Sequence, residues 1–533
     1  MGNSTHGHLS RRSVLRVGAL GATGIAATTL TAGRSSAGQE GADGDSDGTL
    51  RMALAERPAG LDPLDDADPP PDGLAQLTFG GLYTYDASTG LVAYLAAGEP
   101  QIADERRTYV VELREGARFQ NGDPVTAADV RYSFQQARDR DGSERGLATH
   151  LDAVEAIDDR TVRFQLPEAY APFPHLLTQP IVPEAVREAD PEQFRTRPIG
   201  AGPFRVTERL PDESLRLVRW ADYWAEPRPR LEAVEFAAVE TPTVRVNSLT
   251  SGRTDVVESI PPELYPDVAE RPDATIHDAL RMDYVHLAFN CRRGPTADPA
   301  VREAVDHSVS MDRIVAEFVE PVGGRTVSPV PPPLAADWEF PVEDWRAIPR
   351  DRDIEAAREL LESADVPDGW TATILVPGED IYERLAIAVA NGLREAGYGA
   401  SVETLDHEAF DERRVTGDPG DYDMYVDRWT AIPDPDAFVY PLFAADPEGE
   451  TNGTYYRNEA VQAKLETARR AVRRPERRDL YADAITTILE DRAHLPVFVS
   501  RHSFGVGDNV RNFDAHPVTS FRLVSGYNNV SVE

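Results

Sequence analysis

The sequence predicts a mixed α/β protein with more than one lobe. Strand and helix patterns alternate along the chain without an internal repeat, which favours sheets covered by helices. The chain has 533 residues, whereas a single domain typically holds about 50 to 250 residues. Hydrophobic residues make up 41% of the composition, so a chain of this length can bury a large core.

The clearest helix-and-strand unit lies between residues 372 and 405. The run ATILVP (372–377) is typical of a buried strand, and ASVETL (400–405) is typical of a second one. Between them, ERLAIAVANGLREAG (383–397) has the period of an amphipathic helix that ends at Gly397. A strand, a helix and a strand in this order predict a parallel pair joined by a crossover helix.

A second such pattern lies nearer the amino terminus. TYVVEL (108–113) is typical of a strand, and the Asn-Gly-Asp-Pro sequence within FQNGDPV (119–125) predicts a turn. TAADVRYSFQQARD (126–139) is predicted as a helix, with Thr126 as its N-cap and Asp129 three residues further on. Both patterns support the α/β class.

Residues 8–33 have the plan of an export signal. An Arg11-Arg12 pair precedes a weakly apolar run (17–32), and Ser-Ser-Ala follows at a position that suits signal peptidase. A charged pair before a weak apolar segment is typical of twin-arginine export. A transmembrane anchor is the alternative, but the run is shorter and richer in Gly and Thr than the roughly 20 strongly apolar residues of a membrane span. The sequence therefore predicts a twin-arginine-type signal peptide over residues 1–37.

The residues after this signal bear on where the mature chain works. Residues 38–48, GQEGADGDSDG, predict a flexible acidic linker. The only cysteine is Cys291, so no lipid-attachment cysteine follows the apolar run and no internal disulfide is expected. We therefore expect an exported protein, either secreted or held at the extracellular face of the cell membrane.

The charge balance is strongly acidic. The chain has 91 Asp and Glu residues against 55 Lys and Arg, a net charge of −36, and Lys464 is its only lysine. Such a surface is typical of a salt-adapted, halophilic protein, because salt screens the repulsion between the acids. A cation-binding surface or a basic partner is the alternative, but the acids are spread along the whole chain. Nucleic-acid binding is not expected, since no basic stripe is present to neutralise phosphates.

Motifs for catalysis or cofactor binding are not found. The sequence has no P-loop, HExxH, CxxC or GxSxG pattern. GAGPF (200–204) lacks the third glycine of a dinucleotide-binding loop and is predicted as a turn, and His494 and His502 are poorly spaced for a shared metal ion. We therefore expect no enzymatic activity, no cofactor and no metal site, with an exported hydrolase as the alternative.

Six segments, taken together, resemble the extracellular solute-binding proteins of ABC importers, in the large family that binds oligopeptides, dipeptides or nickel complexes. The segments occur in the family's order, and Asp222, Tyr223 and Trp224 match its Asp-Tyr-Trp motif. The six are TYVVELREGARFQNGDPVTAADVRYSF (108–134), IGAGPFRV (199–206), LRLVRWADYWAEPRPRLEAVEF (215–236), VNSLTSGRTDVVESIPP (246–262), VHLAFNCRRGPTADPAVREAVDHSVSMDRIV (285–315) and YDMYVDRWTAIPDPDAF (422–438).

The resemblance implies a two-lobed α/β fold of the periplasmic-binding-protein kind (class II), with a ligand cleft between the lobes. The first lobe would comprise residues 49–284, with an extra subdomain at about 85–200, and residues 496–533, which return to it. The second lobe would comprise residues 285–495. The function implied is hinge closure around a ligand, which only stronger binding to the closed form can drive.

The same resemblance implies the partners. The chain would act as a monomer that captures a short peptide or a similar small organic solute and delivers it to an ABC permease in the membrane. A nickel chelate is an alternative ligand within the family. A receptor that docks on a signal transducer is an alternative function, because a fold alone does not separate the two.

The stretch RWTAIPDPDAF (428–438) is predicted to face the cleft in such a fold. Trp429 offers a ligand a broad apolar wall and one N–H donor. Asp434 suits the cap of the following helix and Asp436 its first turn, where an acid is favoured. Helix initiation and ligand contact therefore remain two interpretations of these acids.

Ile432 marks a departure from the family pattern. Peptide-binding relatives have an Asp at this place, which pairs with the α-amino group of the peptide. Ile cannot neutralise an ammonium, and a buried unpaired ammonium is costly. Either Asp434 or Asp427 replaces that Asp, or the ligand is not a peptide with a free amine.

Three further residues are candidates for ligand contact. Tyr83 follows the region of the first lobe that borders the cleft in relatives. Arg428 offers two donors to a carboxylate, with a surface ion pair as the alternative in so acidic a chain. Tyr455 and its neighbour Tyr456 are placed at the cleft entrance, with packing in the core as the alternative.

Overall fold

The computed structural model describes most of the chain after the amino-terminal segment. The described residues are 48–56, 60–65, 70–139, 147–210, 214–364, 366–367, 369–418 and 420–533. The predicted signal peptide (1–37) and the predicted linker (38–48), apart from Gly48, lie outside them. From residue 48 onward the described residues belong to one compact unit. No helix in this part of the chain is long and apolar enough to cross a membrane.

A twelve-stranded sheet is the centre of this unit. Ten of its strands lie in one row, and β12 (Ala274–Leu280) and β14 (Gly323–Arg325) pair with β18 outside that row. The order of the row is β16 (Gly399–Leu405), β15 (Thr371–Pro377), β17 (Met424–Thr430), β13 (Asp283–Phe289), β18 (His494–Gly507), β11 (Val256–Glu258), β1 (Thr49–Leu54), β10 (Ala233–Ala238), β9 (Ser214–Arg219) and β8 (Phe204–Leu210).

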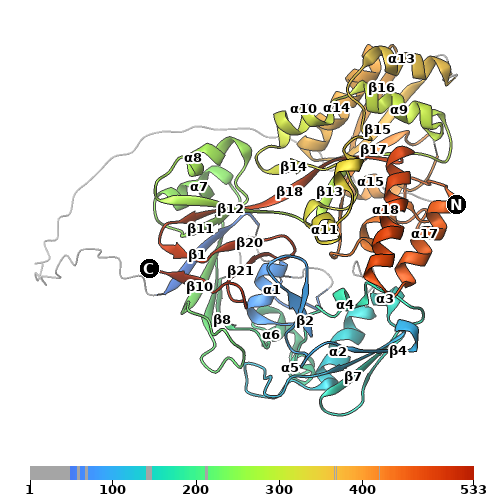
Figure 1. The fold of residues 1–533 in the computed structure, drawn as a ribbon. Coiled ribbons are helices and arrows are strands. Elements are labelled where there is room, and N and C mark those ends of the chain that lie inside the picture. Colours follow the sequence, from blue (N-terminus) through green and yellow to red (C-terminus); the bar gives the residue numbers. More distant parts are fainter. Residues whose placement is uncertain are drawn as a thin grey trace, which may run out of the picture. The chain divides into compact units, whose positions relative to one another are not determined.

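Strand β18 joins two sections of this sheet. Its first part, 494–498, pairs with β13, and its second part, 501–507, pairs with β12. In Figure 1, β18 extends from the section that contains β1, β10 and β11 to the section that contains β13, β15 and β17. The chain therefore passes between the two sections at two adjacent places, within β18 and in the turn between β12 and β13.

The section around β1 is covered on both faces. β1 runs parallel to both β10 and β11, and of its side chains only that of Arg51 is exposed. Leu50 and Met52 enter one apolar cluster, whereas Ala53 enters another on the opposite face. A nearly continuous apolar run is what a parallel strand buried on both faces requires.

The strand–helix–strand unit predicted between residues 372 and 405 is confirmed in the other section. β15 and β16 run parallel over their whole length, and α14 (Asp380–Glu395) crosses between them. The helix begins earlier than predicted, at Asp380, because Asp380 and Glu383 place favourable acids in its first turn. It ends before Gly397, whose φ of +100° is a conformation that glycine adopts freely.

The helix predicted at 126–139 is confirmed as α2 (Ala127–Arg138). Its capping box is formed: the backbone N–H of Asp129 donates to the Thr126 hydroxyl, and the backbone N–H of Thr126 donates to the Asp129 carboxylate over 3.0 Å. This reciprocal pair satisfies two donors that a helix start otherwise leaves free.

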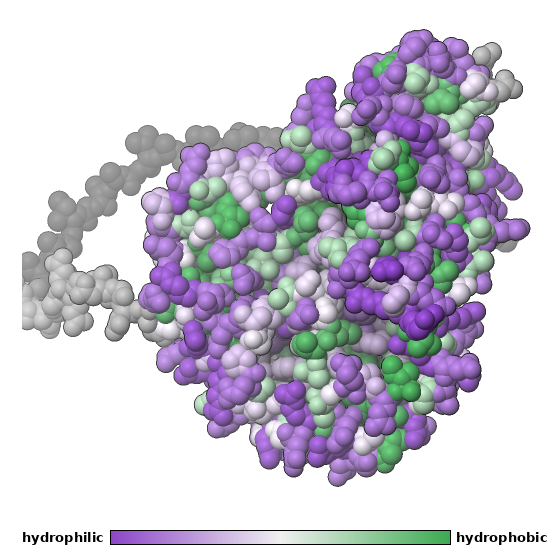
Figure 2. Space-filling view, in the orientation of Figure 1, coloured by the Kyte–Doolittle hydropathy of each residue, from purple (hydrophilic) through white to green (hydrophobic). Residues whose placement is uncertain are grey.

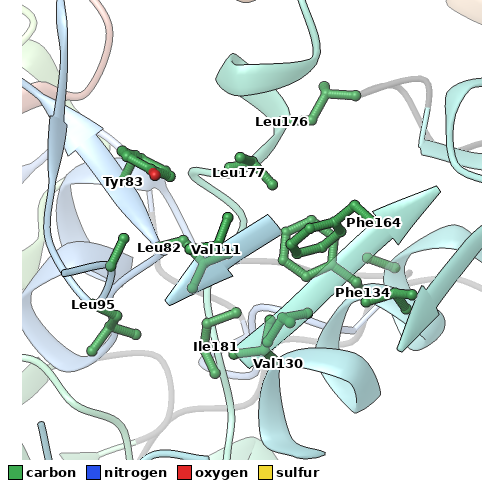
Figure 3. Close-up of a cluster of buried hydrophobic side chains, with 14 of the residues drawn as sticks. Leu82, Tyr83, Leu95, Val111, Val130, Phe134, Phe164, Leu176, Leu177 and Ile181 are labelled. Carbon is green, nitrogen blue, oxygen red and sulfur yellow. The ribbon is translucent and has the colours of Figure 1, made fainter. Parts of the chain in front are cut away.

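Helix α2 belongs with a small four-stranded sheet whose order is β4 (Gln101–Ala103), β5 (Thr108–Glu112), β7 (Thr161–Gln165) and β6 (Ala153–Ala156). Behind this sheet lies a cluster of buried side chains that we call the small-sheet core. Figure 3 shows part of it, with Val130 and Phe134 of α2 close to Phe164 of β7. The rings of Phe134 and Phe164 meet edge to face with centroids 4.8 Å apart, a favoured aromatic geometry.

The predicted GAGPF turn (200–204) lies directly against α1 (Asp72–Thr78). A Cβ on Gly200 would lie 2.0 Å from the carbonyl oxygen of Thr78, and one on Gly202 would lie 2.6 Å from the Thr78 carbonyl carbon. Only glycine permits this approach. The turn thereby fixes α1, which lies beside the cavity described below.

The other elements surround these sheets. Hydrophilic side chains cover much of the face displayed in Figure 2, in keeping with the acidic composition.

The other helices are α3 (Leu147–His150), α4 (Phe173–Leu176), α5 (Glu184–Ala189), α6 (Pro191–Thr196), α7 (Pro242–Thr250), α8 (Tyr265–Ala269), α9 (Pro299–Ser308), α10 (Met311–Ile314), α11 (Pro332–Asp337), α12 (Val342–Trp345), α13 (Ile354–Ser363), α15 (His407–Arg414), α16 (Asp436–Phe443), α17 (Glu459–Arg470) and α18 (Arg474–Glu490). The other strands are β2 (Tyr83–Tyr85), β3 (Leu91–Ala93), β19 (Val510–Arg511), β20 (Asp514–His516), β21 (Ser520–Arg522) and β22 (Ser531–Val532).

Candidate functional site

A cavity of about 1930 Å³ lies between three segments that are far apart in the sequence. Most of its lining comes from residues 71–94, 428–451 and 517–527. Sites for small molecules commonly have volumes of about 300 to 1,000 Å³. This cavity therefore has room for a ligand of several residues or for a smaller ligand with bound water.

Trp429 lies at the end of β17 and lines this cavity. It is half-buried, and its inner side packs against a core that includes Phe438 of α16. Its indole N–H donates to the carbonyl oxygen of Ala437 over 2.7 Å. The predicted use of that N–H as a donor to the ligand is therefore wrong, because the start of α16 already occupies it. The ring face remains as an apolar wall.

Arg428 also lines the cavity, with an exposed side chain. Within the part of the chain that the structure describes, it forms no ion pair with an acid, so the surface pair considered as its alternative is not found there. Burial tends to lower the pKa of Arg428, but the nearby Tyr382, Asp283 and Glu379 outweigh burial and raise it.

Ile432 lines the cavity and packs against the small-sheet core, which includes Tyr83. Its neighbours there are apolar side chains from the opposite wall. At the position where peptide-binding relatives have an Asp, this chain therefore makes an apolar contact across the cavity.

Asp434 lies outside the cavity lining and is only 2% exposed. Both of its carboxylate oxygens accept hydrogen bonds from Arg477, over 2.6 and 2.9 Å, and the backbone N–H of Asp436 donates to it over 2.9 Å. Burial tends to raise the pKa of Asp434, but the Arg477 guanidinium outweighs burial and lowers it. Asp434 is not the N-cap of α16, which is Pro435, but it accepts the N–H of the first helical residue, so its role is in helix initiation and not in ligand contact.

Asp427, the other candidate for the missing anchor, also lies outside the lining. Its carboxylate lies 3.6 Å from the guanidinium of Arg414. Neither acid suggested as a replacement therefore faces the cavity.

The two tyrosine candidates have different positions. Tyr83 lines the cavity with its ring, but its hydroxyl donates to the carbonyl oxygen of Gly98 over 2.7 Å. Figure 3 shows Tyr83 beside Leu177 at the edge of the small-sheet core. Tyr455 is buried outside the lining, with its hydroxyl bonded to the Val415 carbonyl and the guanidinium of Arg292 4.9 Å from its ring centroid. Of the six predicted site residues, the structure brings together Tyr83, Arg428, Trp429 and Ile432 and leaves out Asp434 and Tyr455.

One edge of the cavity is bridged by a set of polar contacts around Arg469 of α17. Its guanidinium lies 3.5 Å from the ring centroid of Tyr440 and 5.2 Å from that of Tyr170, and it pairs with Asp436 over 3.2 Å. The backbone N–H of Ala171 donates to the Arg469 carbonyl over 2.9 Å. Residues on either side of the cavity are therefore in direct contact along this edge.

Two buried histidines lie where β13 and β18 pair. The rings of His286 and His494 stack with centroids 4.1 Å apart. His494 contacts the hydroxyls of Tyr284 and Thr454 over 3.0 and 2.7 Å, whereas neither ring nitrogen of His286 has a partner among the described residues. Burial lowers the pKa of His286 to about 3 and lowers the pKa of His494 as well. Both rings are therefore neutral at physiological pH.

Several lining residues were missed from the sequence. Arg522 and Tyr527 come from a carboxy-terminal segment that has no recognisable motif, and Arg114 and Tyr94 come from turns. Arg114 and Tyr223 lie in segments that resemble the family, 108–134 and 215–236, but nothing in those segments pointed to a ligand contact. Among the described residues, no group of three or more side chains could hold a metal ion.

Comparison with known families gives one extensive match. The model of the bacterial extracellular solute-binding proteins, family 5 (middle region), matches residues 90–450. This range covers more than half of the chain. It includes nearly all of the lining segment 428–451, whereas most of 71–94 and all of 517–527 lie outside it.

Individual relatives extend over nearly all of the described chain. Protein XP55 of Streptomyces lividans is 30% identical over 461 residues, which cover 81% of each chain. The glutathione-binding protein GsiB of Salmonella typhi is 24% identical over 474 residues, 86% of this chain and 91% of GsiB.

A solved structure with the same fold is the periplasmic binding protein DppA of Helicobacter pylori in complex with the peptide STSA. Its TM-score is 0.72 at 22% identity, and the match covers 91% of this chain and 98% of DppA. The predicted periplasmic-binding-protein fold is thereby confirmed.

Proposed function

Because this chain belongs to the bacterial extracellular solute-binding proteins of family 5, we propose that it captures a short peptide or a similar small organic solute in the cavity and delivers it to an ABC permease. The single observation that supports this most is the cavity of about 1930 Å³, whose walls combine residues 428–430 of β17 with the distant segments 71–94 and 517–527. A volume of this size suits a flexible organic ligand.

The peptide class is supported by two relatives. GsiB is a glutathione-binding protein, and DppA is described in complex with a tetrapeptide. The alternatives of an exported hydrolase and of a receptor for a signal transducer have no support among these relatives. Binding without catalysis is the proposal for this chain.

The proposed mechanism is closure of two lobes about the paired strands β13 and β18. The lobes are those expected from the sequence: residues 49–284 with 496–533, and residues 285–495. Strand β18 belongs to both sections of the sheet, and the turn between β12 and β13 connects the same two sections beside it. These two connections would form a hinge at which few backbone angles need to change. A ligand held by Trp429 on one wall and by tyrosines on the other would stabilise the closed form.

The proposal includes export and salt adaptation. The Arg11-Arg12 segment would direct the chain out of the cell by the twin-arginine route, and the net charge of −36 would keep the protein soluble in concentrated salt. The chain would act there as a monomer beside its permease.

The test is to look for a bound solute. The mature chain, purified in molar KCl, is examined by native mass spectrometry, and the peptide Ser-Thr-Ser-Ala and glutathione are titrated calorimetrically. We expect one small molecule per chain, released chemically unchanged after long incubation. Conversion of the bound molecule into products would reject binding without catalysis, and the absence of any bound solute or peptide would reject solute capture.

A further inference from the structure

One arginine in the cavity wall is buried without an acid beside it. Arg522 of β21 is only 8% exposed and lines the cavity. Its terminal nitrogens donate to the Tyr85 carbonyl, over 2.8 Å, and to the Thr84 hydroxyl. Its Nε has no partner, and no carboxylate pairs with it, among the residues that the structure describes.

Such an arginine is unusual on physical grounds. A buried guanidinium loses its hydration, and an anion normally restores part of that loss. Burial lowers the pKa of Arg522, yet arginine remains charged at any physiological pH. Among the described residues Arg245 and Arg302 are also buried without an acid, but they donate to four and three backbone carbonyls. Arg522 has one carbonyl and one hydroxyl as acceptors and keeps an unpartnered Nε.

A second arginine faces the same part of the cavity. Arg114 lies with its guanidinium 5.7 Å from the ring centroid of Trp224 and forms no ion pair in the described parts of the chain. The hydroxyls of Tyr94 and Tyr223 lie 2.7 Å apart, and the Tyr94 hydroxyl also lies 3.5 Å from the carbonyl oxygen of Ala201. Burial raises the pKa of Tyr94 to about 12, and the charges of Arg522 and Arg114 both oppose that rise. Both guanidiniums therefore lie within electrostatic reach of the same hydroxyl pair.

The acids that line the cavity do not neutralise these arginines. Asp86 accepts from the backbone N–H groups of Ser88 and Gly90. The partners of the others are Arg228 for Glu226, Arg469 for Asp436 and the Tyr440 hydroxyl for Asp446, and Glu450 is exposed. The wall at Arg522 is thus locally cationic within a strongly anionic protein.

We infer that Arg522 and Arg114, with the Tyr94–Tyr223 hydroxyl pair, form a subsite for a carboxylate group of the ligand. The inference rests on the proposed capture of a solute in this cavity and deepens it, because it names the charged group that the solute must carry. A guanidinium binds a carboxylate with two parallel hydrogen bonds, and tyrosine hydroxyls complete such a site. For a peptide, its terminal carboxylate would lie here, in the wall opposite Trp429 and Ile432.

The test compares Ser-Thr-Ser-Ala with its carboxy-terminal amide, titrated into the mature chain at constant KCl. We expect the wild-type protein to bind the free acid at least about tenfold more tightly than the amide, the effect of one charge-assisted hydrogen bond. In Arg522→Gln that preference should disappear, and Arg522→Lys should restore part of it. Arg511→Gln removes a positive charge from the same carboxy-terminal segment outside the cavity lining, and it should keep the full preference.

The outcomes separate the two proposals. Equal binding of acid and amide by the wild-type protein would overturn the carboxylate subsite and leave solute capture intact, and this comparison needs no variant to fold. Should the wild-type protein bind neither form of Ser-Thr-Ser-Ala, the chemical identity of the co-purified solute, determined by mass spectrometry, decides whether the carboxylate subsite exists. A solute that carries a carboxylate would support it, whereas a neutral solute or a phosphate ester without a carboxylate would overturn it.

Discussion

Arg477 of α18 donates to both carboxylate oxygens of Asp434, over 2.6 and 2.9 Å, two residues before the first residue of α16. The pair is almost completely buried, and Asp434 also accepts the backbone N–H of Asp436. It therefore fixes the end of the stretch that carries Trp429 and Ile432 into the cavity wall.

Replacing Asp434 should destabilise the fold rather than remove a ligand contact. Asp434→Ala leaves the Arg477 guanidinium buried and unpaired, which should lower the free energy of unfolding by about 3 to 5 kcal/mol. Urea unfolding in molar KCl measures this change. The control is Asp479→Ala at an exposed pair with Arg478, where the loss should stay below about 1 kcal/mol. A stable Asp434→Ala protein that no longer binds solute would instead place this acid at the ligand.

Trp429→Ala should weaken solute binding by roughly tenfold to a hundredfold, because it removes a large aromatic wall from the cavity. Trp429→Phe is the matched control, since it keeps a ring in the wall and loses only the hydrogen bond to Ala437. Calorimetric titration with the solute found by mass spectrometry gives both affinities, and circular dichroism in the same buffer checks folding. Unchanged affinity in the alanine variant would exclude Trp429 from the site.

Ile432→Asp tests whether the family's usual anchor can be restored. In the structure Ile432 packs on the small-sheet core, so a carboxylate there would be desolvated without a partner. We expect weaker binding of Ser-Thr-Ser-Ala to this variant than to the wild type, while Ile432→Val binds nearly as well. Tighter binding of the free-amine peptide, lost when its amine is acetylated, would show that the anchoring site persists.

The buried histidines predict a loss of stability in acid. The pKa of His286 is about 3 in the folded protein, below its ordinary value of about 6.5. Between these two pH values the unfolded chain binds a proton on His286 that the folded chain does not bind. The contribution of the neutral buried ring to the free energy of unfolding is therefore fully present above about pH 6.5 and is lost as the pH falls toward 3. His286→Asn should make the dependence of the unfolding free energy on pH shallower by about 1.4 kcal/mol per pH unit in this window. An unchanged slope would show that His286 is not buried as a neutral ring.

Changing Arg11-Arg12 to Lys-Lys should hold the precursor in the cytoplasm, because the arginine pair is the recognised feature of the predicted signal. Cell fractionation and immunoblotting measure the ratio of precursor to exported protein. Normal export of the variant would reject the twin-arginine route.

Local patterns predicted the local structure well. The period of residues 383–397 and the apolar runs beside it predicted α14 between β15 and β16, and the spacing of Thr126 and Asp129 predicted a capping box that is formed. Each of these features depends on residues close together in the sequence, where propensity and side-chain spacing decide the outcome.

The site was predicted only in part, because it depends on contacts between distant segments. Trp429 and Ile432 came from a recognisable motif. Arg522, in contrast, meets Thr84 and Tyr85 across more than 400 residues of sequence, and no local pattern signals such a meeting. Asp434 was wrongly expected to be available to a ligand. Its partner, Arg477, lies on another helix, so the motif alone could not show that Asp434 is buried and paired.

The position of β18 in the middle of the central sheet has a consequence for the order of synthesis. β18 begins at His494 in a chain of 533 residues, yet it separates β13 from β11 and is hydrogen-bonded to both. A chain still growing on the ribosome therefore lacks the strand on which both sections of the sheet depend. The final fold can form only after residues 494–507 have been synthesised, and a premature stop before residue 494 leaves two half-sheets with unpaired edges that are prone to aggregate.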